Sequence, residues 1–104
     1  MARRRLKLTW SPRARRHLRE ILQRIRDDDR LAAKRFLQRI KAFANRLKEQ
    51  PRIGRVVPEF GLEHLRERIF GNYRIVYRLQ GEEEVLEGEI VAVIHTRREM
   101  PELN

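Results

Sequence analysis

The sequence has no cysteine, which excludes disulfide bonds, thiolate nucleophiles and cysteine-based zinc sites. Histidine is scarce as well, because only His17, His64 and His95 occur, and their spacing is not that of metal ligands. We therefore expect neither a structural metal nor a cofactor. Apolar runs fall well short of the ~20 residues of a membrane-spanning helix, and no apolar segment follows the basic N-terminal residues as in a signal peptide. The cytoplasm is the expected location.

Acidic residues are few in the first half of the chain. Residues 1–55 hold 19 Lys+Arg against 5 Asp+Glu, whereas residues 56–104 hold 6 against 10, and the net charge is +10. This asymmetry predicts an anionic partner, either nucleic acid, a membrane surface or an acidic protein, with solubility alone as the alternative. Arginine outnumbers lysine 21 to 4, and its planar guanidinium suits phosphate and carboxylate recognition.

Apolar residues recur with regular spacing along the chain, in numbers sufficient for the core of a single domain. A chain of 104 residues supports one compact core, so residues 1–104 are treated as one domain. Alternating apolar and polar residues over 6–10 predict a short half-buried strand. Ser11 and Pro12 then begin a helix, as its cap and its first residue. The apolar stripe of this helix has a 3.6-residue period and comprises Ala14, Leu18, Ile21, Leu22 and Ile25.

A second amphipathic helix is predicted over about residues 30–49. The aspartates at 27–29 separate it from the first helix and suit the positive end of its dipole. Its apolar residues are Ala33, Phe36, Leu37, Ile40, Phe43, Ala44 and Leu47. Pro51 ends it, and residues 51–64 are expected to form a loop. Two stripes joined by so few residues predict a helical hairpin.

Three strands rich in β-branched and aromatic residues are predicted over 65–70, 73–79 and 90–98. A Gly71-Asn72 turn joins the first two, and an acidic turn with a hairpin extension or bulge precedes the third. Alternation along the middle strand gives a core face of Tyr73, Ile75, Tyr77 and Leu79 and an opposite face of Arg74, Val76 and Arg78. We expect the two tyrosines to pack in the core, with base stacking as the alternative.

These elements predict an α+β fold of two layers in the order β-α-α-β-β-β. The helical hairpin would cover one face of a mainly antiparallel sheet, and the other face would keep its arginines exposed. Candidate functional residues lie on or just after the strands and are Arg66, Arg68, Arg74, Arg78, His95, Arg97 and Arg98.

Guanidinium groups converging on a sheet face would bind a phosphate backbone or stabilise a phosphorane-like transition state. His95 would act as a general acid or base. The alternatives are ion pairs with strand glutamates and a structural histidine. Strand register decides which arginines share a face, since a one-residue slip inverts it, and we expect such an irregularity near Glu87-Gly88.

The order and spacing of several segments resemble the RelE/ParE superfamily of toxins from type II toxin–antitoxin modules. The segments are 8–14, 47–51, 54–59 and, most strongly, 65–67, 73–78 and 93–98. The resemblance implies the two-layer fold above and a small cytoplasmic toxin without a cofactor or membrane partner. It also implies a cognate antitoxin that wraps the toxin, and contact with operator DNA only through that antitoxin. A mixed apolar and basic helix surface offers a groove for an amphipathic segment.

The superfamily holds two activities. RelE-like members are metal-independent endoribonucleases that cleave mRNA in the ribosome, and the matching catalytic residues here would be Arg66, Arg68, Arg74, His95 and Arg97. Arginine replaces lysine at 66 and 68 and does not readily give up a proton, and Leu103 falls near the place of a C-terminal tyrosine.

ParE-like members instead poison DNA gyrase, and the ending over 93–101 looks more like that branch. Residues contacting the target would then be Arg74, Arg78, Arg97 and Arg98. We favour the ParE-like interpretation, which leaves open whether the chain is an enzyme. A non-toxic basic binding module is the third alternative.

Overall fold

The computed structural model describes residues 6–82 and 85–103. The predicted acidic turn at 81–84 therefore lies partly outside the described residues. The elements are β1 (Lys7–Trp10), α1 (Pro12–Asp28), α2 (Arg30–Asn45), the 3₁₀ helix η1 (Arg46–Lys48), β2 (Arg55–Val56), β3 (Leu65–Phe70), β4 (Tyr73–Glu82) and β5 (Val85–His95). The predicted α+β fold is confirmed, with one addition, because the short strand β2 forms within the segment expected to be a loop.

The two helices form the predicted hairpin and turn within a single residue. The Ser11 hydroxyl accepts a hydrogen bond from the Ala14 amide at 3.0 Å and caps α1. Asp29 ends α1 through its own amide, which donates to the Ile25 carbonyl, and its carboxylate caps α2 by accepting from the Leu31 and Ala32 amides. One aspartate thus satisfies backbone groups of both helices.

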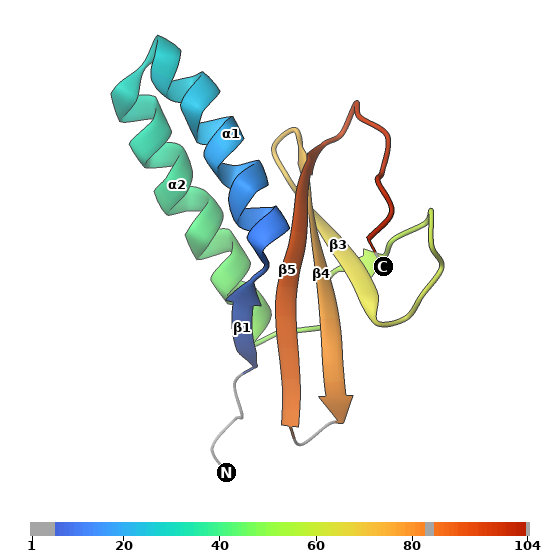
Figure 1. Cartoon of the computed structure of the whole chain (residues 1–104). Helices are drawn as coiled ribbons and strands as arrows, with labels where there is room; N and C mark the ends of the chain where they lie inside the picture. Colours follow the sequence, from blue (N-terminus) through green and yellow to red (C-terminus); the bar gives the residue numbers. More distant parts are fainter. Residues whose placement is uncertain (1–5, 83–84, 104) are drawn as a thin grey trace.

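The sheet has the order β1-β5-β4-β3-β2. β1 pairs parallel with β5, and every other pair is antiparallel. Figure 1 shows the helical hairpin on one side of the sheet, with the segment after β5 and the loop before β3 on the other. The register shift lies between Val76 and Tyr77, opposite Val91, so the irregularity expected near Glu87-Gly88 is at a different place.

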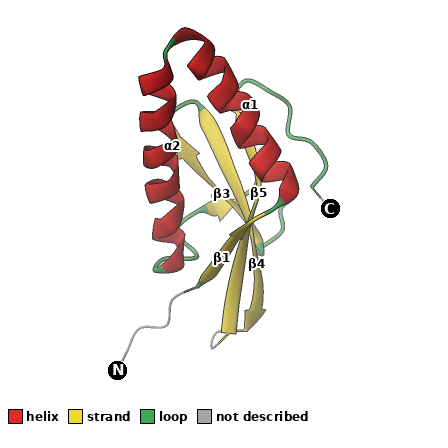
Figure 2. Cartoon of the chain, turned by 60° about the vertical axis from the view of Figure 1, so that its left-hand side comes forward, coloured by secondary structure: helices red, strands yellow, loops and turns green. Residues whose placement is uncertain are grey.

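The two helices cover one side of the sheet (Figure 2), and the larger of the two cores lies between helices and sheet. Ile40 and Tyr77 have no exposed surface, and α1 contributes Leu18 and Ile21. Tyr73 is half-buried and packs edge-on against Phe36. Both tyrosines therefore lie in the core or against it, as expected from the alternation along β4.

The opposite face of the sheet carries a second core, and the expectation that it stays exposed is wrong. Its buried residues are Val57, Leu65, Val76, Val91, Ala92, Ile94 and Leu103, with Phe60 and Met100 packed against them. The cover comes from the loop before β3 and from residues 100–103. Sparse apolar residues in two irregular segments carry no periodic signal, which is why this layer escaped the sequence prediction.

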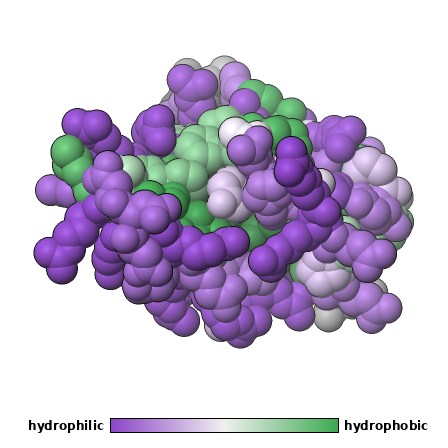
Figure 3. All heavy atoms as spheres, turned by 90° about the horizontal axis from the view of Figure 1, so that it is seen from above, coloured by the Kyte–Doolittle hydropathy of each residue, from purple (hydrophilic) through white to green (hydrophobic). Residues whose placement is uncertain are grey.

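Hydrophilic side chains cover most of the face seen in Figure 3, and apolar ones show through in its middle. Neither α1 nor α2 has the length and apolar content that crossing a bilayer requires, in a search confined to the described residues.

Candidate functional site

The structure divides the predicted site residues between the two faces of the sheet. Arg66 and Arg68 stand opposite Tyr77 and Ile75 in the β3–β4 register, and cross-strand partners share a face, so both lie on the helix side. Arg74 and Arg78 belong to the opposite face. His95 pairs with Tyr73 on the helix side, and Arg97 and Arg98 follow in an exposed turn. No single surface gathers these seven residues.

Arg74 is held by carboxylates from two segments. Its Nε donates to Glu67 Oε1 at 2.6 Å, and its two terminal nitrogens donate to the two oxygens of Glu59, also at 2.6 Å. Glu67 is 1% exposed and Arg74 is 9% exposed. Arg55 adds a second cation to Glu67 at 2.7 Å. Such a bidentate, charge-assisted arrangement fixes the loop that bears Glu59 to the sheet.

The hydrogen bonds from Arg74 lower the pKa of Glu59 to about 2. A depressed carboxyl pKa adds stability above the pKa of the unfolded chain, and this contribution is lost as pH falls from about 4.5 toward 2. We expect the wild-type melting temperature to fall more steeply over this window than that of Glu59→Gln, with the two curves meeting near pH 2. Glu49→Gln, which removes an exposed carboxylate, should keep the wild-type slope. Parallel wild-type and Glu59→Gln curves would contradict this role.

Arg66 and Tyr77 fasten the loop before β2 to the helix side. The Arg66 guanidinium donates to the carbonyls of Gly54 and Glu63. The Tyr77 hydroxyl accepts from the Gly54 amide at 2.9 Å and donates to the Pro51 carbonyl at 2.7 Å, and burial raises its pKa. A Cβ at residue 54 would lie 2.6 Å from both the Glu67 carbonyl oxygen and the Tyr77 hydroxyl, so glycine is required there.

Arg68 and Arg78 also contact the protein itself. The Arg68 guanidinium lies 4.2 Å from the centroid of the Phe43 ring in a cation–π contact. Arg78 donates to the Leu103 carbonyl at 2.5 Å and helps to hold the C-terminal segment on the sheet. Arg97 is exposed and remains available to a partner.

A groove runs between the two helices and β1. Its apolar lining is Trp10, Leu18, Leu22 and Leu37, and its rim is Arg15, Arg19 and Lys41. The volume is about 380 Å³. Among the described residues no acidic side chain lines it, so this surface combines exposed apolar area with positive charge.

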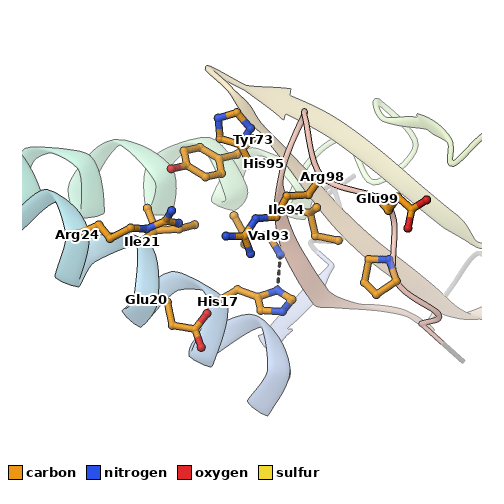
Figure 4. Close-up of a pocket in the computed structure, with 11 residues that line it drawn as sticks. His17, Glu20, Ile21, Arg24, Tyr73, Val93, Ile94, His95, Arg98 and Glu99 are labelled. Atoms are coloured by element: carbon orange, nitrogen blue, oxygen red, sulfur yellow. Dashed lines mark hydrogen bonds between the residues drawn. The ribbon is translucent and has the colours of Figure 1, made fainter.

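A second cavity, of about 210 Å³, lies between α1, the end of β5 and the segment after it (Figure 4). His17 lines it, and its Nδ1 accepts a hydrogen bond from the Val93 amide at 3.1 Å. Burial lowers the pKa of His17, and Arg16 lowers it further. His17 was not among the predicted site residues, although its position three residues after Ala14 and four before Ile21 places it beside the buried stripe of α1.

The described residues contain no group of three or more side chains arranged to hold a metal ion. They form a groove with a basic rim, an exposed turn with two arginines, and a cavity lined by two arginines, two histidines and two glutamates. Most sheet arginines that were candidates for chemistry instead hold loops in place.

Comparison with known proteins identifies a family for the chain. A search of curated proteins found no match to the chain. The family model described as the ParE toxin of the type II toxin–antitoxin system parDE matches residues 8–100, which spans the whole of both helices and all five strands except Lys7. The chain therefore belongs to the ParE toxin family of type II toxin–antitoxin systems.

Proposed function

We propose that this toxin inhibits growth by poisoning DNA gyrase and that a cognate antitoxin neutralises it. The family match over residues 8–100 carries the proposal. The separation of the basic residues supports gyrase over the ribosome, since cleavage of mRNA needs groups preorganised around one phosphate. Arg66 and Arg68 lie on one face of the sheet, whereas Arg74 lies on the other and is occupied by two carboxylates.

Induction of the toxin in bacteria without an antitoxin tests the target. Gyrase poisoning predicts growth arrest with broken chromosomal DNA, detected by pulsed-field electrophoresis, and no new mRNA 5′ ends by primer extension. New 5′ ends within codons and intact DNA would instead establish the ribosome-dependent endoribonuclease. Undisturbed growth at high expression would favour the non-toxic binding module.

We propose the groove between the helices and β1 as the binding site for the antitoxin. An amphipathic helix with an acidic polar side fits it, because Leu22 and Leu37 offer apolar contact while Arg19 and Lys41 stand at the rim. Rim charges of this sign would steer an acidic segment toward the toxin and discriminate against basic ones. The antitoxin is thus the partner proposed for the groove, and the positive charge of the groove favours an acidic segment of that antitoxin.

Leu22→Glu should weaken antitoxin binding at least about tenfold, because it places a negative charge in the apolar contact opposite an acidic segment. Leu22 is only half-buried, so the fold should survive. Leu31→Glu is the matched control, since Leu31 is 53% exposed and lies outside the groove. Titration calorimetry with the purified antitoxin measures both. Equal affinities of the two variants would place the antitoxin elsewhere.

A further inference from the structure

We propose that the cavity between α1 and the end of β5 binds a phosphate group. This site goes beyond gyrase poisoning and does not depend on it. Its cations are Arg24 from α1 and Arg98 from the turn after β5, and both line the same cavity. Figure 4 shows Arg24 reaching across from the helix and Arg98 folding back over Val93.

The two guanidinium groups have no carboxylate within ion-pair distance among residues 6–82 and 85–103, where the salt bridges all involve Arg55, Arg66 or Arg74. Glu20 and Glu99 also line the cavity, but in Figure 4 their carboxylates point away from both arginines. An anion placed between two such cations is attracted by both. The two guanidinium groups can therefore pair with an external anion.

Apart from the two glutamates, the other polar side chains that line the cavity can donate hydrogen bonds. His17 Nδ1 accepts from the Val93 amide, and His95 Nδ1 accepts from the Arg97 amide at 3.1 Å. With Nδ1 accepting, Nε2 is the ring nitrogen that can donate. The Tyr73 hydroxyl is a further potential donor at this site. The lining therefore combines histidine, tyrosine and arginine, whose side chains donate to oxyanions.

The size of the cavity limits the ligand. Its 210 Å³ falls below the range of about 300–1,000 Å³ typical of pockets for whole small molecules. A phosphate group with its nearest substituent fits better than a complete nucleotide. The phosphate can be free or terminal, or it can belong to a nucleic-acid backbone, and the same donors would recognise each.

The test follows the Val93 amide and the two imidazole rings by NMR while inorganic phosphate is added at constant ionic strength. We expect saturable shifts at these groups in the wild type. The double variant Arg24→Gln/Arg98→Gln should bind at least about tenfold more weakly, since each charged hydrogen bond contributes on that scale. Both arginines are exposed, so the fold should persist. Arg26→Gln, which removes an exposed arginine of the same helix outside the cavity, is the control for the loss of a surface charge.

Two short oligonucleotides, identical except for a 5′-phosphate, then distinguish a terminal phosphate from a backbone phosphate as the ligand. Saturable shifts with the phosphorylated strand alone identify a terminal monoester, and equal shifts with both strands identify the backbone diester. Either result supports the site if the double variant abolishes it. The proposal is overturned if neither phosphate nor either strand saturates these signals, or if the double variant binds as tightly as Arg26→Gln.

Discussion

Arg74→Ala is expected to lower the free energy of unfolding by about 3–5 kcal/mol, the cost of removing one partner of a buried ion pair. Glu67 is 1% exposed, and without Arg74 its carboxylate keeps only Arg55, whose side chain is 64% exposed. Glu59 would lose its bidentate partner at the same time. Urea unfolding followed by circular dichroism measures the loss.

Arg55→Ala is the control for this prediction. It removes the other cation from Glu67 but costs only about 1 kcal/mol or less, because the Arg55 side chain is largely exposed to solvent and Glu67 keeps its buried partner Arg74. Adding Glu67→Gln to Arg74→Ala should recover part of the stability, since the buried carboxylate that has lost its buried partner is then removed. A stable Arg74→Ala protein that has lost toxicity would instead make Arg74 a target contact.

Leu103→Ala should destabilise the protein by about 2–3 kcal/mol, through lost apolar burial and the cavity left behind. Leu103 is 3% exposed and closes the second core, against Val76 and Ile94. For a domain of this size the melting temperature would fall by about 10 °C or more. Differential scanning calorimetry gives the value directly.

Leu62→Ala makes the same change at a leucine that is 38% exposed, where an effect within about 0.5 kcal/mol is expected. Equal melting temperatures for the two variants would mean that residues 100–103 do not cover the sheet in solution. The second core would then be an exposed surface, as the sequence alone had suggested.

The fold was predictable because its signals are periodic. The stripes of α1 and α2, the cap at Ser11 and the alternation along β4 each specify local structure, and they agree with one another. The end of α2 was placed too late, at residue 49, because Leu47 continues the apolar spacing although residues 46–48 form a 3₁₀ turn. The two residues of β2 are too short to show any alternation.

The site was less predictable because the contacts of its residues come from segments distant in the sequence. Alternation placed Arg74 on the correct face, but nothing local indicates that Glu59, 15 residues earlier, occupies its guanidinium. Val57, Met100 and Leu103 are single apolar residues in irregular segments, and only the folded chain brings them together. The hydrogen bond of His17 to Val93 spans 76 residues and depends in the same way on tertiary packing.

We have proposed that this ParE-family chain acts by docking on gyrase, while most of its sheet arginines hold the fold together. The most direct measurement adds the purified toxin to DNA gyrase, supercoiled plasmid and ATP, and quantifies linear DNA after protease treatment. We expect cleaved DNA that accumulates with toxin concentration and disappears when the antitoxin is added first. Unchanged supercoiling and cleavage at saturating toxin would contradict it.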